Sequence, residues 1–149
     1  MIAPPWLATA VEQAKQAADL HTSSLSQAIA RAAMTASWFP THVAGLQAAT
    51  RTKRDVLLDA LAARLGDELE TTHPTGGMFV WATFRDGTDT ANLLAPALEH
   101  GVAFVPGAAF AVERPADASL RLSWATSTPD ELTEAVDRLA TAHQALTRA

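Results

Sequence analysis

Arg121 is the side chain in this sequence best suited to bind a charged small molecule, and it lies in the segment Leu120-Arg-Leu-Ser-Trp124. Apolar and polar residues alternate there, so a β-strand would place both leucines and Trp124 on one face, with Arg121 and Ser123 on the other. A guanidinium presents a planar set of donors that fits a carboxylate through two parallel hydrogen bonds. Arg121 is therefore a candidate carboxylate-binding residue. The alternative is an exposed strand arginine paired with a nearby acidic side chain.

The pair Pro106-Gly107 is a second candidate for contact with a ligand. It follows a predicted strand over Val102–Val105, and the pair is typical of a type II turn. Glycine lets a backbone approach a ligand closely, whereas Pro-Gly turns are common and require no ligand. Both interpretations of this loop stay open.

Other kinds of site are not predicted. The five histidines include no pair at a spacing of four and have no acidic residue at metal-ligand spacing, so we expect no metal site. Cysteine is absent, which removes disulfides, thiolate ligands and cysteine nucleophiles. No nucleophile elbow, Walker loop or GxGxxG motif is present. The acidic pairs Asp130-Glu131 and Asp67-Glu68 fit a helix start and a loop, and need no acid–base role.

The first half of the chain is alanine-rich, and its pattern predicts three helices. They cover about Trp6–Asp19, Ser24–Thr35 and Thr41–Leu65. The hydroxyl-rich stretch His21–Ser24 is suited to capping the second helix, and Trp38-Phe39-Pro40 is expected to interrupt the chain before the third. Val43, Leu46, Leu57, Leu61 and Leu65 are expected on one stripe of that helix, with Gly66 at its C-terminal cap.

The second half of the chain has the pattern of strands and helices in alternation. Strands are predicted over Met78–Phe84, Val102–Val105 and Leu120–Ala125. A helix capped by Asp89 and ended by Gly101 lies between the first two, and Pro96 should kink or shorten it. Thr128-Pro-Asp-Glu131 is a capping box that starts the last helix. The sequence thus predicts an α+β fold, in which helices lead into a small mixed or antiparallel sheet covered by helices.

Composition and charge narrow the class of protein. The 149 residues carry a net charge of −5, and 48% of them are hydrophobic, which is typical of one folded domain. No excess of basic residues favours nucleic acid or an anionic membrane as a partner. No apolar run reaches the roughly 18 residues of a membrane span. With no signal-peptide pattern at Met1, a cytoplasmic location is expected.

Three segments, in this order and spacing, resemble the carboxy-terminal third of fold-type I pyridoxal-phosphate aminotransferases. The branch they are most similar to includes the 2-aminoadipate and kynurenine aminotransferases. The segments are Pro74-Thr-Gly-Gly-Met-Phe-Val-Trp81, Gly101-Val-Ala-Phe-Val-Pro-Gly107 with Phe110, and Leu120-Arg-Leu-Ser-Trp124. Upstream, Ala3-Pro4-Pro5 and Asp19-Leu-His-Thr-Ser-Ser24 with Gln27 resemble the segment that follows the cofactor lysine in that family.

The resemblance implies roles for particular residues. Arg121 would bind the α-carboxylate of an amino-acid or 2-oxo-acid substrate, and Pro106 and Gly107 would lie near its side chain. Thr22 and Ser23 would reach the cofactor phosphate of a neighbouring subunit, although helix capping is the interpretation that we favour for both. Residues 1–40 would be a helical remnant of the large cofactor domain, and residues 41–149 the small domain. The partners implied are the missing large domain or a second subunit.

The resemblance also implies what this chain lacks. The family binds pyridoxal phosphate through a lysine in a Ser-x-Lys context, whereas Lys15 and Lys53 stand in other contexts and tyrosine is absent. We therefore expect no catalytic residue in this chain, no cofactor bound by it alone, and no activity without the rest of the enzyme. Two alternatives are the effector-binding part of a GntR/MocR-type transcriptional regulator and a stand-alone ligand-binding or interaction module.

Overall fold

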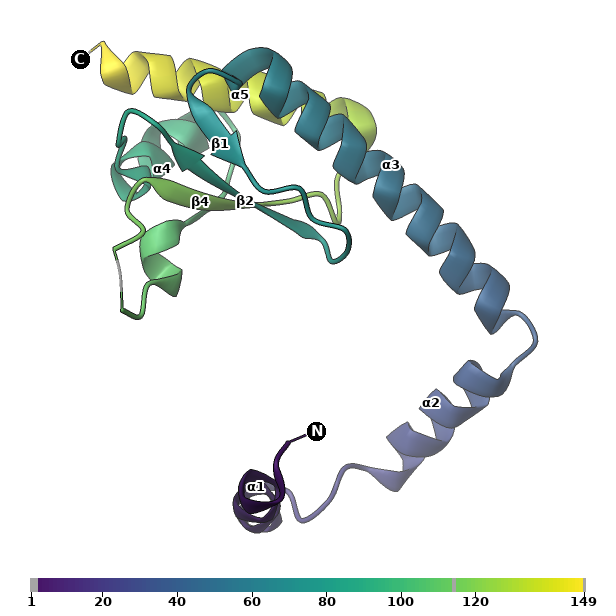
Figure 1. The fold of residues 1–149 in the computed structure, drawn as a ribbon. Coiled ribbons are helices and arrows are strands. Elements are labelled where there is room, and N and C mark those ends of the chain that lie inside the picture. Colours follow the sequence, from purple (N-terminus) through teal and green to yellow (C-terminus); the bar gives the residue numbers. More distant parts are fainter. Residues whose placement is uncertain (1–2, 114, 149) are drawn as a thin grey trace. The chain divides into compact units, whose positions relative to one another are not determined.

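The computed structural model describes residues 3–113 and 115–148, which belong to two compact units (Figure 1). The first unit comprises residues 1–44 and the second comprises residues 45–149. Each unit is described by itself below.

The first unit consists of helices connected by short turns. Helix α1 spans Pro5–Ala18, with a proline at its first position, and α2 spans Ser24–Thr35. The Ser23 hydroxyl caps α2 by accepting a hydrogen bond from the Ser26 amide at 3.4 Å. Both helices match the prediction closely. Neither contains a buried residue, so local helix propensity, the proline at the start of α1 and the Ser23 cap of α2 account for them within this unit.

Helix α3 spans Phe39–Leu65 and begins two residues before the predicted start. The expected interruption between α2 and α3 is present at Ala36–Trp38 and not at Trp38-Phe39-Pro40. Pro40 lies in the first turn of α3, where a missing amide N–H breaks no helical hydrogen bond. Gly66 ends the helix without a left-handed conformation. A Cβ at Gly66 would lie 2.4 Å from the Ala62 carbonyl oxygen, so close backbone approach accounts for this glycine.

The apolar stripe of α3 is buried only in the C-terminal half of the helix. Leu57, Leu61 and Leu65 are each at most 3% exposed, whereas Leu46 is 59% exposed. The predicted stripe is therefore buried from Leu57 onward, whereas Leu46 is not covered. Heptad-like spacing predicts an apolar face but does not show whether anything covers it.

The sheet has four antiparallel strands in the order β1-β2-β4-β3. Strand β1 spans Leu69–Thr71, β2 spans Phe79–Phe84, β3 spans Val105–Pro106 and β4 spans Ser119–Ser123. The prediction of Met78–Phe84 is confirmed to within one residue. The predicted strand over Val102–Val105 is wrong in extent, because only Val105 and Pro106 pair with β4. The three-residue strand β1 was not predicted.

Helices α4 and α5 complete the second unit. Helix α4 spans Thr90–Glu99 and is capped by Asp89, whose carboxylate accepts from the Ala91 amide at 2.8 Å. The helix continues through Pro96 to Glu99, since the carbonyl that loses its partner belongs to the exposed residue Asn92. Helix α5 spans Pro129–Thr147 and starts with the predicted capping box.

One hydrophobic core joins these elements on a single face of the sheet. Trp124 is 1% exposed, directly after β4. The C-terminal half of α3 and helix α5 run alongside the sheet (Figure 1). Three helices (α3, α4 and α5) and two strands (β2 and β4) contribute most of its side chains, which are Leu57, Leu61, Leu65, Val80, Ala82, Phe84, Leu93, Ala97, Leu120, Leu122, Leu132, Val136 and Leu139. The fold is therefore α+β, with helices covering one face of a small antiparallel sheet.

Candidate functional site

The candidate site lies on the face of the sheet opposite the core. Because side chains alternate along a strand, the burial of Leu120 and Leu122 places Arg121 on that second face, as predicted. Trp81 of β2 and Val105 of β3 are the register partners of Arg121 on either side. Directly paired residues of antiparallel strands share a face, so Trp81, Arg121 and Val105 form one row across three strands.

Two phenylalanine rings hold the Arg121 guanidinium. Its Cζ atom lies 4.2 Å from the ring centroid of Phe79 and 4.7 Å from that of Phe110. Phe79 begins β2, and Phe110 ends the 3-10 helix η1, Gly107–Phe110. Phe110 also packs against Trp81, with centroids 5.7 Å apart and the rings at 76°. We call Phe79 and Phe110 the aromatic pair. Phe110 belongs to the second of the segments that carry the family resemblance, but the sequence did not predict that these rings contact Arg121.

No acidic side chain in the described ranges, 3–113 and 115–148, forms an ion pair with Arg121. The alternative of an arginine neutralised by a neighbouring carboxylate is therefore not what the structure shows. By contrast, Arg85 faces Glu70 at 3.7 Å and Arg64 pairs with Asp137. The guanidinium of Arg121 thus keeps its charge and its N–H donors available on a partly exposed face.

Pro106 and Gly107 lie beside Arg121 in the fold, but their geometry differs from the prediction. Pro106 pairs with Leu120, so its ring is on the core side of the sheet. Gly107 starts η1 and has no positive φ, so the predicted type II turn is wrong. A Cβ at Gly107 would lie 2.3 Å from the Ala116 carbonyl oxygen and 2.7 Å from that of Ser119. Backbone packing therefore requires glycine here whether or not a ligand binds.

Thr22 and Ser23 belong to the first unit, whereas Arg121 belongs to the second. Ser23 is the N-cap of α2. The Thr22 carbonyl oxygen accepts a hydrogen bond from the Gln27 side-chain amide at 2.9 Å. Both residues thus have a local structural function, and both side chains are exposed.

The two lysines are engaged in contacts of their own. The Lys15 Nζ atom lies 2.8 Å from both carboxylate oxygens of Asp19, four residues further along the chain. The Lys53 Nζ atom donates to the Ala125 carbonyl oxygen at 3.4 Å. Within the second unit, Lys53 contacts neither Arg121 nor the aromatic pair among the recorded contacts.

His143 is a buried polar residue that the sequence did not reveal. It is 3% exposed, stacks on Phe84 with centroids 4.3 Å apart, and its Nε2 lies 3.0 Å from both Asp86 and Thr88. Glu68 Oε2 lies 3.1 Å from Nδ1, but not in hydrogen-bonding geometry. Sequence separations of 57 and 75 residues hid this cluster from motif spacing.

The same cluster affects one carboxyl group. Burial raises the pKa of Asp86, but hydrogen bonds from Thr88 and then from His143 outweigh burial, so the net pKa is lowered. Asp86 is therefore ionised at neutral pH and serves as an acceptor that ties α5 to the turn after β2. Within the described part of the chain, no group of three or more histidine or acidic side chains could hold a metal ion.

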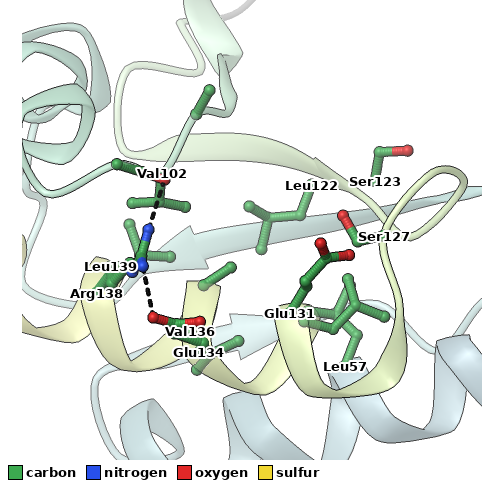
Figure 2. Close-up of a pocket in the computed structure, with 14 residues that line it drawn as sticks. Leu57, Val102, Leu122, Ser123, Ser127, Glu131, Glu134, Val136, Arg138 and Leu139 are labelled. Atoms are coloured by element: carbon green, nitrogen blue, oxygen red, sulfur yellow. Dashed lines mark hydrogen bonds and ion pairs between the residues drawn. The ribbon is translucent and has the colours of Figure 1, made fainter.

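A hollow of about 400 Å³ lies between α5 and the segment before β3 (Figure 2). Its charged groups already have partners in the protein. Arg138 donates to the Gly101 carbonyl oxygen at 3.3 Å and pairs with Glu134, and Glu131 completes the α5 capping box. Hydrogen bonds from the Thr128 backbone and hydroxyl lower the pKa of Glu131. This hollow therefore offers less free charge than the face that carries Arg121.

The described helices include none that is both long enough and apolar enough to cross a membrane.

Comparisons with known proteins agree on one family. The family model described as aminotransferase class I and II matches residues 2–139. Aromatic-amino-acid aminotransferase 1 of Thermococcus litoralis is 36% identical over 138 residues, which cover 93% of this chain and 33% of the relative. The crystal structure of LysN, the α-aminoadipate aminotransferase of Thermus thermophilus, superposes with a TM-score of 0.87 at 35% sequence identity. The match covers 99% of this chain and 38% of the LysN chain.

A more distant match is a transcriptional regulator. The HTH-type regulator YdfD of Bacillus subtilis is 28% identical over 125 residues, covering 84% of this chain and 26% of the regulator. The chain spans about one third of the length of the aminotransferase relatives it matches.

Proposed function

The chain belongs to the aminotransferase class I and II family, and on that premise we propose that it is the carboxy-terminal part of an enzyme that transfers amino groups between an amino acid and a 2-oxo acid. The observation that carries the proposal is Arg121 on the second face of the sheet, in contact with two aromatic rings and without an acidic partner among the described residues. An amino acid and a 2-oxo acid both carry the carboxylate that such a guanidinium binds through two hydrogen bonds.

Pyridoxal phosphate is the cofactor that the family implies, and it supplies the electron sink for amino-group transfer when bound. The residues of this chain do not fit it by themselves. Lys15 is paired with Asp19, Lys53 is bonded to a backbone carbonyl, and the candidate phosphate contact Ser23 is used as a helix cap. We propose that the rest of the enzyme holds the cofactor, and that this chain contributes the substrate-carboxylate contact.

The two units suggest how the chain joins that enzyme. Helices α1 and α2 have no buried residue, and they expose Leu25 and Ile29 on one side of α2, at 70% and 62%. We propose that residues 1–40 belong to the large cofactor domain, and that residues 41–149 are the small domain. The missing part of that domain, or a second subunit, would cover these apolar side chains.

The test is Arg121→Lys in the intact enzyme. Lysine keeps the charge but cannot form two parallel hydrogen bonds to a carboxylate, so we expect the KM for the amino-acid substrate to rise about 10-fold or more. The amount of bound pyridoxal phosphate should not change. Arg85→Lys is the matched control, because Arg85 is exposed beside Glu70 at 3.7 Å and lies outside the site. An unchanged KM in Arg121→Lys would contradict the carboxylate role.

The similarity to YdfD supports one alternative, the effector-binding part of a transcriptional regulator. In that case Arg121 would bind the carboxylate of an effector that is not turned over. The same intact protein distinguishes the two functions, since a regulator would show carboxylate-dependent DNA binding, whereas an enzyme would convert an amino acid to its 2-oxo acid. A stand-alone binding module would do neither.

A further inference from the structure

We propose that Phe79 and Phe110 are positioning residues, which fix the Arg121 guanidinium through the faces of their rings and leave its N–H donors free for a carboxylate. The inference rests on the proposed function only for which carboxylate binds. The contact between the two rings and Arg121 does not depend on the proposed function.

The geometry supports contact with both rings at once. The Cζ atom of Arg121 lies 4.2 Å from one ring centroid and 4.7 Å from the other, both inside the roughly 6 Å within which a ring face attracts a cation. The rings come from different elements, because Phe79 begins β2 and Phe110 ends η1. Two contacts from independent elements restrict the guanidinium more than either ring alone.

The rings are themselves held in place. Phe110 and Trp81 pack in a T-shaped arrangement with centroids 5.7 Å apart, and Trp81 is the register partner of Arg121 across β2 and β4. Phe79 is the register partner of Ser123, two residues further along β4. The arrangement thus rests on the strand register, which is fixed by the burial of the opposite face.

An aromatic face has a chemical advantage over an acidic partner at this position. A carboxylate would orient the guanidinium equally well, but it would occupy the N–H donors and compete with the incoming ligand. A ring face attracts the positive charge without taking up the N–H donors as a carboxylate does, so those donors stay free for a ligand. An arginine without either partner would lose side-chain conformational entropy when a ligand binds. Because the aromatic pair already orders the Arg121 side chain in the free protein, part of this entropy loss does not oppose binding.

The size of the effect follows from the exposure of the rings. Phe79 is 46% exposed and Phe110 is 42% exposed, so water weakens each contact toward the lower range for exposed cation–π pairs. Loss of one ring should weaken carboxylate binding about threefold, and loss of both about 10-fold. Leucine is the informative replacement, because it keeps apolar volume without the ring quadrupole. Tyrosine keeps the ring and should restore binding.

The experiment uses the full 149-residue chain labelled with ¹⁵N-arginine. The Arg121 side-chain Nε–Hε signal, assigned by its loss in Arg121→Lys, is followed by NMR in the wild type, F79L, F110L, the double variant, F79Y and F110Y. We expect a ring-current shift and restricted motion in the wild type. Both should be reduced in each leucine variant and retained in the tyrosine variants. Val112→Leu is the matched control, since Val112 is 94% exposed and apart from the recorded contacts of Arg121.

Each variant is then titrated with acetate as the carboxylate probe. The expected outcome is the threefold and 10-fold weakening given above, with rescue by tyrosine. If leucine leaves the shift, the motion and the acetate affinity of Arg121 as in the wild type, the positioning role is overturned. If the rings fix Arg121 but acetate does not perturb its signal even in the wild type, the carboxylate role under the proposed function fails and the positioning role stands.

Discussion

Gly107 is the first residue of η1, directly after the edge strand β3. The surrounding backbone packs so closely that it leaves no room for a side chain at this position. A Cβ there would lie 2.3 Å and 2.7 Å from the carbonyl oxygens of Ala116 and Ser119. Neither atom can rotate away, so the chain must shift. We expect Gly107→Ala to lower the free energy of unfolding by about 1–3 kcal/mol, as overpacking typically does.

Urea denaturation of the full chain measures this prediction. Gly45→Ala is the matched control, because a Cβ at Gly45 meets nothing within 4 Å and lies inside a helix. Alanine there should leave stability unchanged or raise it by up to about 1 kcal/mol. Equal effects of the two substitutions would show that Gly107 is not under packing constraint.

Single residues also show the limit of what the sequence could predict. Strand alternation was sufficient to place Arg121 on the polar face, because the leucines on either side of it must be buried. The same reasoning could not predict the aromatic pair, since Phe79 and Phe110 come from segments 31 residues apart in the chain. Nor could it find His143 beside Asp86. Contacts of this kind depend on tertiary packing, which leaves no fixed spacing in the sequence.

At the scale of elements, the capping box predicted at the start of α5 is present in the structure with both of its hydrogen bonds. The Glu131 amide donates to the Thr128 hydroxyl at 3.3 Å, and the Glu131 carboxylate accepts from the Thr128 amide at 2.7 Å. Thr128→Ala removes the first bond and leaves an amide without a cap. We expect the free energy of unfolding to fall by about 1 kcal/mol.

Thr133→Ala is the matched control for the capping box. Thr133 lies in the interior of α5, and its hydroxyl donates back to the Pro129 carbonyl oxygen at 3.2 Å. Alanine is the better helix former, so stability should stay the same or rise slightly. The prediction is checked by chemical denaturation followed by circular dichroism, and it would be contradicted if Thr133→Ala cost as much as Thr128→Ala.

Helices that begin at a capping residue were predicted with nearly correct bounds, whereas short strands without a clear sequence pattern were not. Ser23, Asp89 and Thr128 each mark a helix start correctly. Strand β1 was missed because three residues are too few to establish a period. Val102–Val105 was predicted as a strand from its apolar run, but only Val105 pairs with β4, while Val102 and Phe104 are buried without pairing. Burial and strand pairing both favour apolar residues, so composition alone could not separate them.

At the scale of the whole molecule, the order of three short motifs carried more information than any one of them. Each motif alone is compatible with many folds, yet together they indicated the family that the comparisons confirm. The motifs could not predict which apolar side chains in the first half of the chain are buried by other parts of the protein. Leu46 and Leu57 look alike in the sequence, but the first is 59% exposed and the second 3%.

The distribution of burial predicts that residues 45–149 fold without residues 1–44. Every described buried residue lies between Leu57 and His143, and neither α1 nor α2 contributes one. We therefore expect a chain starting at Gly45 to keep the unfolding free energy of the second unit within about 0.5 kcal/mol. Unfolding is followed by the fluorescence of Trp81 and Trp124, which both remain in the shortened chain.

A chain starting at Asp59 is the control, since it loses the buried side chain of Leu57 and should be destabilised by about 3 kcal/mol or more. If the chain starting at Gly45 lost its cooperative transition, the first unit would be part of the folding unit, and the proposed boundary near residue 40 would be wrong.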